Sequence, residues 1–290
     1  MKATNNIPFV FFGTPQFAVF VLEELLREGL KPSLVVTAPD KPQGRGLLLT
    51  PPPVKVWAEE NKIPFLQPAK LDTDFTNKLK TGSYKLFVVA AYGKIIPKEV
   101  LDIPPHGTLN VHPSLLPKYR GASPLQSQIL KGEKEIGVTI MLIDEEMDHG
   151  PILESRKLKV ESEKNASELG KDLAQLGGKL LSEVIPKWIA KEIKPKEQNH
   201  EEATFTKKVT KEDGLINLKN DDQYKNYLKY LALDPWPGVY FFALRREQKI
   251  RVAIKKAEFI DDKFVIKEVL PEGGKVMAFD DFLRGGVVIE

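Results

Sequence analysis

The sequence contains no cysteine among its 290 residues. This absence excludes disulfide bonds, thiolate-bound metals, iron–sulfur clusters and a cysteine nucleophile. The chain also lacks any run of about 18 apolar residues, the length that a membrane-spanning helix needs. Its first residues, Met1–Pro8, have neither the charged start nor the apolar core of a signal peptide. These absences fit a reducing compartment, so we expect a cytoplasmic protein without a membrane partner.

The sequence also lacks an excess of charge of one sign. It has 43 basic and 40 acidic residues, which gives a net charge of +3. This balance makes no case for nucleic-acid binding, so any such role must depend on where the charges lie. Hydrophobic residues make up 42%, which is enough for a sizeable core. A length of 290 residues favours two domains.

Short apolar runs alternate with helical patterns in the N-terminal part of the chain. Leu86–Ala91 is a continuous apolar run, as expected for a strand that is buried on both faces of a parallel sheet. A helix is predicted over Pro15–Arg27, because proline is well tolerated in the first helical turn. The alternation indicates an α/β domain with a mostly parallel sheet. Its other predicted strands are Ile7–Gly13, Ser33–Ala38, Pro64–Leu66, Thr108–His112 and Gly137–Ile143.

The pattern changes toward the C-terminus. Ala166–Ile189 has apolar residues at helical spacing, and Pro186 is expected to kink or split this helix. After a helix near Asp221–Leu233, short strand-like segments joined by tight turns suggest a small β-barrel. These segments are Gly238–Leu244, Lys249–Ile254 and Lys263–Val269. We therefore predict an α/β domain at 1–189, a charged linker at 190–204 and a C-terminal domain at 205–290.

One constellation points to chemistry. Asn110 and His112 are two residues apart in a strand, so their side chains share a face at the end where open α/β sheets bind ligands. Asp148 follows a later strand and can reach His112. An amide, an imidazole and a carboxylate together suit acyl transfer without a covalent enzyme intermediate. The alternative is a polar strand end beside an ordinary acidic turn. No second histidine stands at ligand spacing, so no metal site is expected.

Two further segments could bind a ligand. Gly13-Thr14-Pro15 follows the first strand but is not the glycine-rich dinucleotide fingerprint, so it favours a turn that lines a substrate cleft. Pro39–Pro53 is a long loop rich in glycine and proline, and its Arg45 could contact a phosphate or a base. An ordinary surface loop is the alternative. In the C-terminal region, a basic cluster includes Arg245, Arg246, Lys249 and Arg251, although an ordinary solvated hairpin would look the same.

Across almost its whole length, the sequence resembles the methionyl-tRNA formyltransferases of bacteria and organelles. The Asn110, His112 and Asp148 signature is shared by the wider family of 10-formyltetrahydrofolate-dependent formyltransferases. The Gly-Arg-Gly loop and the Pro-Trp-Pro-Gly segment are more specific to the tRNA enzymes. The matching segments are Phe12–Ala18, Gly44–Gly46, Pro51–Val56, Ala90–Gly93, Asn110–Pro117, Met147–Gly150 and Asp234–Gly238.

This resemblance implies a Rossmann-like catalytic domain and an OB-like C-terminal domain. It implies formyl transfer from 10-formyltetrahydrofolate, a co-substrate, to the α-amine of methionine on the initiator tRNA, without a metal. We expect the protein to act as a monomer. The resemblance assigns catalysis to Asn110, His112 and Asp148. It implies that folate is bound by Ser114, Leu115, Leu116, Pro117, Ala91 and Tyr92, and tRNA by Lys41, Arg45, Arg245, Arg246, Lys249 and Arg251.

The sequence departs from the family pattern after the Gly-Arg-Gly loop, where Leu47, Leu48 and Leu49 replace residues that are often basic. This loop is therefore expected to depend on Lys41, Arg45 and apolar contacts. Two rival functions remain open. One is a formyltransferase of the same fold that acts on a sugar nucleotide or on glycinamide ribonucleotide. The other is a non-catalytic RNA-binding protein built on the barrel.

Overall fold

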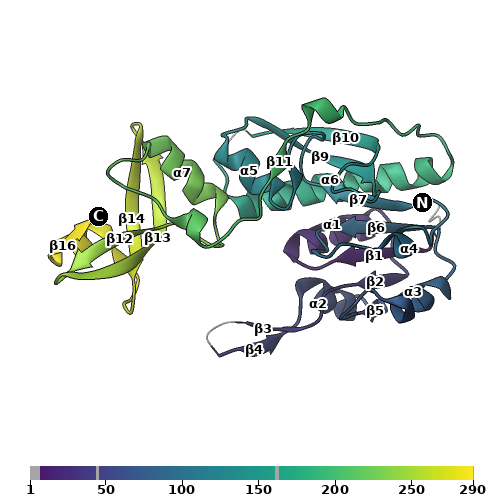
Figure 1. Ribbon diagram of the computed structural model, residues 1–290, viewed down its shortest axis with the longest axis horizontal. Helices are drawn as coiled ribbons and strands as arrows, with labels where there is room; N and C mark the ends of the chain where they lie inside the picture. Colours follow the sequence, from purple (N-terminus) through teal and green to yellow (C-terminus); the bar gives the residue numbers. More distant parts are fainter. Residues whose placement is uncertain (1–6, 44–45, 161–162, 290) are drawn as a thin grey trace. The chain divides into compact units, whose positions relative to one another are not determined.

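The computed structural model describes residues 7–43, 46–160 and 163–289 (Figure 1). Contacts between Cα atoms divide the chain into two compact units. Unit 1 consists of Met1–Arg120, Ile136–Leu158 and Gly170–Phe205. Unit 2 consists of Gly121–Glu135, Lys159–Leu169 and Thr206–Glu290. Two segments from the N-terminal part of the sequence, Gly121–Glu135 and Lys159–Leu169, therefore belong to unit 2. The predicted domain boundaries at 189 and 204 stay predictions.

Unit 1 is built on a seven-stranded sheet in the order β10-β9-β7-β6-β1-β2-β5. Pairing is parallel from β7 through β6, β1 and β2 to β5, whereas β9 runs antiparallel to β7. Together with its helices, this sheet confirms the predicted mostly parallel α/β fold. The strands are β1 (Phe9–Gly13), β2 (Leu34–Val36), β5 (Phe65–Leu66), β6 (Leu86–Ala90), β7 (Thr108–His112), β9 (Glu135–Leu142) and β10 (Ile152–Lys159).

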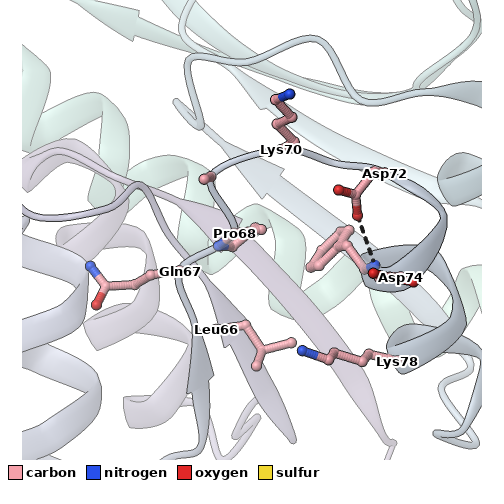
Figure 2. A pocket seen from close by; sticks show the side chains of 9 residues that line it. Leu66, Gln67, Pro68, Lys70, Asp72, Asp74 and Lys78 are labelled. Carbon is pink, nitrogen blue, oxygen red and sulfur yellow. Dashed lines mark hydrogen bonds between the residues drawn. The ribbon is translucent and has the colours of Figure 1, made fainter.

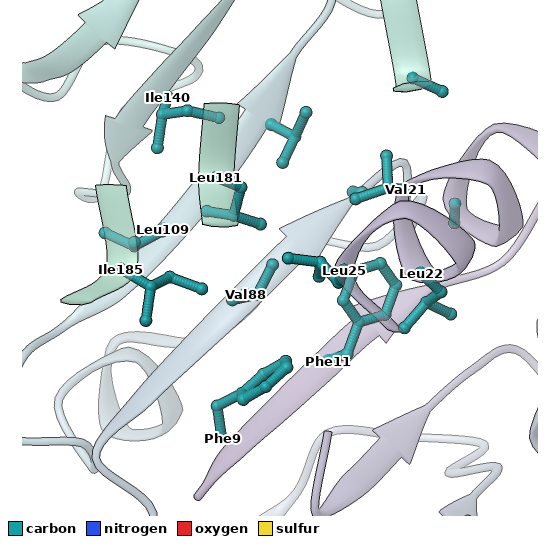
Figure 3. Close-up of a cluster of buried hydrophobic side chains, with 14 of the residues drawn as sticks. Phe9, Phe11, Val21, Leu22, Leu25, Val88, Leu109, Ile140, Leu181 and Ile185 are labelled. Atoms are coloured by element: carbon teal, nitrogen blue, oxygen red, sulfur yellow. The ribbon is translucent and has the colours of Figure 1, made fainter. Parts of the chain in front are cut away.

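Both faces of the sheet are covered, which explains why its central strands are apolar throughout. Phe9 and Phe11 of β1 pack on one face with α1 (Gln16–Arg27), α2 (Pro53–Glu60) and α6 (Ala166–Ile189), as Figure 3 shows in part. Val10 and Phe12 alternate to the other face, against α3 (Thr73–Lys80) and α4 (Lys98–Leu101). Burial of each such side chain stabilises the fold by about 1.5–3 kcal/mol.

Helix α6 occupies the predicted range, and it runs unbroken through Pro186. A split at Pro186 is therefore wrong, whereas a kink there stays a prediction. The proline stands in the last helical turn, and it removes only the one backbone hydrogen bond that its own N–H would have donated. Near its middle, Gly177 lies so close to β7 that an added Cβ would meet Val111 at 2.6 Å. This glycine lets the helix approach the strand that carries the candidate site.

The segment Pro39–Pro53 is not one structureless loop. Lys41–Gln43 (β3) and Leu48–Thr50 (β4) pair as an antiparallel hairpin, and α2 begins at Pro53. The predicted linker also has structure of its own. Lys196 forms an isolated antiparallel bridge with Ile152, and His200–Glu202 form a 3-10 turn. Sequence periodicity missed the hairpin and the bridge because they depend on pairing between chain segments, and it missed the 3-10 turn because three residues are too few for a periodic pattern.

Unit 2 contains a five-stranded antiparallel sheet, ordered β15-β14-β13-β12-β16. Strand β13 extends to Ile260, beyond the predicted end at Ile254. Closure into an OB-like barrel stays a prediction. The strands are β12 (Tyr240–Arg245), β13 (Gln248–Ile260), β14 (Lys263–Pro271), β15 (Met277–Ala278) and β16 (Val287–Ile289). The helices are α5 (Pro124–Leu130), α7 (Gln223–Ala232) and α8 (Phe279–Arg284).

Candidate active site

The carboxyl end of β7 carries the two polar residues that the sequence singles out. Asn110 is half-buried and His112 is buried, with 4% of its surface exposed. Asp148 arrives from the turn between β9 and β10. Its Oδ1 accepts a hydrogen bond from Asn110 Nδ2 at 3.4 Å and lies 3.5 Å from His112 Nδ1. The structure therefore brings these three side chains together within unit 1, and Asp148 Oδ1 is their common point.

A backbone carbonyl fixes the orientation of the His112 ring. Nε2 lies 3.0 Å from the carbonyl oxygen of Tyr119. A carbonyl oxygen can only accept, so Nε2 must carry a proton. A neutral His112 consequently has its lone pair on Nδ1, the nitrogen that faces Asp148. Proton exchange with a substrate is thus directed to the Nδ1 side of the ring.

The backbone of Asp148 is strained and held by a residue that the sequence analysis missed. Its φ of 52° lies in the left-handed region, which is unfavourable for a residue with a Cβ. Nε2 of Gln198 donates to the carbonyl oxygens of Asp148 at 2.9 Å and of Gly150 at 2.8 Å. Gln198 in turn accepts from buried Arg120 through Oε1. Arg120 follows His112 by only a few residues in the sequence, but no local pattern links it to Gln198.

The segment predicted to bind folate is only partly accessible. Ser114 and Leu116 are buried, and the Ser114 hydroxyl donates to the Lys118 carbonyl oxygen at 2.7 Å. Backbone N–H of Leu116 donates to Thr139 Oγ1 at 3.2 Å. Leu115 and Pro117 are half-buried. Ser114 and Leu116 therefore hold the conformation of the segment, whereas Leu115 and Pro117 are the residues that a ligand can contact.

Ala91 and Tyr92 follow β6, the strand that pairs with β7. Ala91 is exposed, with a φ of 48°, and Tyr92 is buried. Burial raises the pKa of the Tyr92 phenol to about 12. Within the described residues, its hydroxyl is a buried polar atom without a hydrogen-bond partner. Such a group is costly to bury unpaired, which is a reason to expect a ligand atom beside it.

The base of the β3–β4 hairpin is anchored by Asp40. Its carboxylate accepts from Gln67 Nε2 at 2.7 Å and from Lys55 Nζ at 2.7 Å, and these bonds lower the pKa of Asp40. Gln67 also lines a hollow of about 360 Å³ between the end of β5 and α3, shown in Figure 2. None of the residues with a predicted role in catalysis or binding lines that hollow.

Of the hairpin residues predicted to contact tRNA, Lys41 is exposed, whereas Arg45 lies outside the described residues. Lys94, which no sequence motif marked as a binding residue, lies near Lys41. Desolvation, followed by the positive charge of Lys41, lowers the pKa of the Lys94 ammonium. Two cations thus lie near each other beside the hairpin. Leu47, Leu48 and Leu49 are 72%, 74% and 68% exposed, so the hairpin also presents an apolar tip.

In unit 2, the structure places the predicted basic residues on two faces of the sheet. Lys249 and Arg251 share a face, where they lie over the rings of Phe242 at 4.5 Å and Tyr240 at 3.8 Å. Arg245 is the next residue after Leu244, which is opposite Lys249, so its side chain points to the other face. Arg246 stands in the exposed turn between β12 and β13. The predicted cluster is thus divided.

The geometry in unit 1 is suited to acid–base chemistry beside a developing negative charge. It offers an amide donor, an imidazole that can exchange a proton through one defined nitrogen, and a carboxylate that contacts both. Within the described residues, no group of three or more His, Asp or Glu side chains could hold a metal ion. In the same part of the chain, no helix is long and apolar enough to cross a membrane.

Comparison with known proteins gives a consistent result. Residues 5–185 match the model of a family described as formyl transferase. A methionyl-tRNA formyltransferase of Thermodesulfovibrio yellowstonii is 41% identical, and the match covers 97% of this chain and 96% of that protein. The enzyme of the same name from Thermus thermophilus is 40% identical, with 95% of each chain covered. The solved methionyl-tRNA formyltransferase of Clostridium thermocellum superposes with a TM-score of 0.60 at 18% identity, covering 94% of this chain and 99% of that one.

Proposed function

Because the chain belongs to the formyl transferase family, we propose that it transfers the formyl group of 10-formyltetrahydrofolate to methionine on initiator methionyl-tRNA. The product is N-formylmethionyl-tRNA, which is used in translation initiation. The observation that carries the proposal is the contact of Asp148 Oδ1 with both Asn110 and His112. The near full-length similarity to methionyl-tRNA formyltransferases supports the choice of acceptor.

Asn110 is the electrostatic catalyst in this account. The donor supplies a formyl carbon that the methionine α-amine attacks directly, so the formyl oxygen gains negative charge. The Asn110 side-chain amide has two N–H donors, and one of them is engaged by Asp148. The second N–H can stabilise the developing oxyanion. Removal of one oxyanion donor typically lowers kcat by about 10²–10³.

His112 and Asp148 handle the proton. The attacking amine must lose a proton, and the folate nitrogen must gain one as its bond to the formyl carbon breaks. His112 Nδ1, facing Asp148 at 3.5 Å, can take up the first proton. Asp148 then stabilises the resulting imidazolium and orients the ring. The same pair can return the proton to the leaving nitrogen, directly or through water.

The formyl donor fits the carboxyl ends of β6 and β7. Ala91 and Tyr92 directly follow β6, and Leu115 and Pro117 follow β7. The side chains of Leu115 and Pro117 are the accessible part of the predicted folate segment. The unpaired Tyr92 hydroxyl supports a polar contact there. Ser114 and Leu116 contribute by holding the segment in shape, since their polar groups are already bonded inside the protein.

For tRNA, we assign separate roles to the two units. Lys41 of β3 and Arg45, which follows β3 in the sequence, contact the acceptor end, with Lys94 as an additional cation and Leu47, Leu48 and Leu49 as an apolar contact. Lys249 and Arg251, with Arg246 in the nearby turn, contact the phosphate backbone. Arg245 on the other face contributes less. In this proposal, tRNA is bound by a few basic residues at defined positions, since the net charge of the whole chain is only +3.

The rival functions make different demands on the chain. A sugar-nucleotide or glycinamide ribonucleotide formyltransferase would use the same three residues, but its small acceptor would leave the basic residues assigned to tRNA without a role. A non-catalytic RNA-binding protein would have no reason to bring Asn110, His112 and Asp148 to one point. The proposed reaction places the protein in the cytoplasm. A monomer suffices, because all three catalytic residues come from one chain.

The decisive experiment offers several acceptors to the purified protein with 10-formyltetrahydrofolate. We expect formylation of methionyl initiator tRNA and little transfer to uncharged tRNA, an amino-sugar nucleotide or glycinamide ribonucleotide. His112→Ala serves as the matched negative control. Transfer to a small acceptor in preference to methionyl-tRNA would support the first rival. Tight tRNA binding without product, in the presence of a demonstrably bound folate, would support the second.

A further inference from the structure

We propose that Gln198 is a positioning residue that holds Asp148 in its working orientation. The proposal rests on the proposed function, since it concerns the same site. Gln198 is buried, with 5% of its surface exposed, although it lies in the charged segment that the sequence analysis treats as a linker. A buried glutamine in such a segment requires partners, and its partners lead directly to Asp148.

All hydrogen-bonding positions of the Gln198 side chain are in use. Arg120 donates to Oε1 from Nε at 3.1 Å and from Nη2 at 2.7 Å. Because a guanidinium can only donate, the atom that faces Arg120 must be the amide oxygen. Nε2 therefore faces the two carbonyl oxygens of Asp148 and Gly150, where it donates both of its protons. Arg120 thus fixes the rotation of the amide, and the amide fixes the loop.

These bonds act on the backbone at the point of strain. Asp148 adopts its φ of 52° while its carbonyl oxygen and that of Gly150 bind one donor atom. Without that donor, the turn can relax toward φ values that suit a residue with a Cβ. Such relaxation would move Oδ1 away from Asn110 and His112. The positioning role therefore follows from where the two carbonyls lie.

The segment Lys196–Thr204, here called the strap, also supports the other partner of His112. At one end, Lys196 and Ile152 exchange two backbone hydrogen bonds of 2.8 Å. At the other end, Thr204 Oγ1 accepts from the Tyr119 N–H at 2.8 Å, and the Thr204 carbonyl oxygen accepts from the Arg120 N–H at 2.8 Å. The Tyr119 carbonyl is the acceptor for His112 Nε2. The strap thus supports both groups that flank the His112 imidazole, the Tyr119 carbonyl at Nε2 and the Asp148 carboxylate at Nδ1.

A further contact ties the strap to the loop. The rings of His149 and His200 are stacked, with centroids 4.1 Å apart and planes 3° from parallel. His200 Nδ1 lies 2.9 Å from Arg120 Nη2, and His149 Nδ1 lies 2.7 Å from Asp144 Oδ2. Because the Arg120 guanidinium can only donate, His200 Nδ1 accepts this bond. Arg120 therefore contacts both strap residues that hold the 148–150 turn.

The test compares Gln198→Met, which keeps the size of the side chain, with Gln198→Glu. The glutamate can still accept from Arg120 but presents an acceptor to the two carbonyl oxygens. We expect both substitutions to lower kcat by about 10–100-fold, as is typical when a supporting residue of a site is lost. The KM for folate should change less than about twofold, because Gln198 does not contact the predicted folate segment. Gln128→Met is the matched control, since Gln128 is also buried but donates to Pro124 in unit 2; its kcat should stay unchanged.

A double mutant distinguishes positioning from a general loss of stability. In an Asp148→Asn background, Gln198→Met should cause no further loss of the single-turnover rate, since residues that act as a unit are not additive. Independent, multiplicative losses would overturn the proposal, as would wild-type kcat in both single variants. If Gln198→Met does not fold, Gln198→Glu carries the same test, because it removes the same two bonds that Gln198 donates to the carbonyl oxygens of Asp148 and Gly150.

A readout without tRNA separates this proposal from the proposed function. The chain has only 4 histidines, so the ¹⁵N spectrum of its imidazoles is simple. Gln198→Met should change the His112 Nδ1 signal, and His112→Ala identifies that signal by its loss. An unchanged His112 signal in Gln198→Met would overturn the positioning role even if the enzyme formylates methionyl-tRNA. Conversely, a changed signal without any formylation would contradict only the proposed function.

Discussion

The carbonyl oxygen of Tyr119 lies 3.0 Å from Nε2 of His112. This contact assigns the proton of a neutral His112 to Nε2 and leaves Nδ1, which faces Asp148, to exchange protons with the substrate. Tyr119 itself has a left-handed φ of 64°. The acceptors on both sides of the imidazole thus stand in unfavourable backbone conformations, which is a common feature of functional sites.

The role of Asn110 can be tested by truncation. We expect Asn110→Ala to lower kcat by about 10²–10³, because the second N–H of its amide is the proposed oxyanion donor. The KM for 10-formyltetrahydrofolate should change little. Steady-state kinetics with varied folate measures both quantities. An increase in KM at unchanged kcat would show that Asn110 binds the ground state instead.

Removal of the Tyr92 hydroxyl should not destabilise the protein at neutral pH. Tyr92→Phe takes away a buried hydroxyl that has no partner in the described residues, so the free energy of unfolding should stay equal or rise. The KM for folate should increase if this hydroxyl binds the donor. Urea unfolding and steady-state kinetics check the two parts. A loss of stability of about 1 kcal/mol or more would indicate a hydrogen bond to this hydroxyl.

Tyr92 also predicts a difference at alkaline pH. Its pKa is raised from 10.0 to about 12 in the folded protein, so the unfolded chain ionises first as the pH rises. The cost of ionising the buried phenol does not act below pH 10, and it lowers the free energy of unfolding progressively between about pH 10 and 12. The wild type should therefore lose more stability than Tyr92→Phe over this interval. Parallel loss in both proteins would contradict the raised pKa.

Lys41 is expected to contact a tRNA phosphate. Lys41→Ala should raise the apparent KM for methionyl-tRNA and leave the KM for folate unchanged, because Lys41 is an exposed cation and is not among the residues predicted to bind folate. The slope of log affinity against log salt should fall by about 1. Lys80→Ala, an exposed lysine on α3, is the matched control. Equal effects of Lys41→Ala on both substrates would count against the assignment.

The turn between β12 and β13 offers a test of backbone strain. Arg246 and Glu247 both have positive φ values, 50° and 65°, in a two-residue hairpin turn that favours Asn-Gly. Glu247→Gly should stabilise unit 2 by about 1 kcal/mol. Gln248→Gly, one residue into β13, should instead destabilise it by about 0.5–1 kcal/mol. Thermal unfolding of both variants measures the difference, and a lower Tm for Glu247→Gly would contradict the strain.

The elements that the sequence predicted well have strong local signals. The structure has the predicted bounds for the strand Thr108–His112 and for the helix Ala166–Ile189. A buried strand and a long amphipathic helix can be predicted because each has a characteristic spacing of apolar residues. The position of Asn110 and His112 on the same face of the strand follows from the two-residue period of a strand. The predicted roles of both residues depend on the family resemblance and on chemistry, and they stay predictions.

The features that the sequence did not reveal depend on distant contacts. Gln198 lies in a segment without periodicity, and its role appears only when Arg120 and the 148–150 turn are in place. The hairpin at 41–50 has Pro42 within a strand and no Asn-Gly turn, so no standard signal marked it. Strand β10 carries a mainly polar, partly exposed face, which concealed it from a search for apolar runs.

The most direct test of the central claim is the single-turnover rate of formyl transfer to methionyl initiator tRNA, measured with saturating wild-type protein and with Asp148→Asn. The substitution keeps the shape of the side chain but removes its charge, so His112 loses the group that stabilises its protonated form. We predict rapid formation of N-formylmethionyl-tRNA by the wild type and a rate about 10²–10⁴-fold lower in Asp148→Asn, with folate binding unchanged. A near-normal rate in Asp148→Asn would contradict the account.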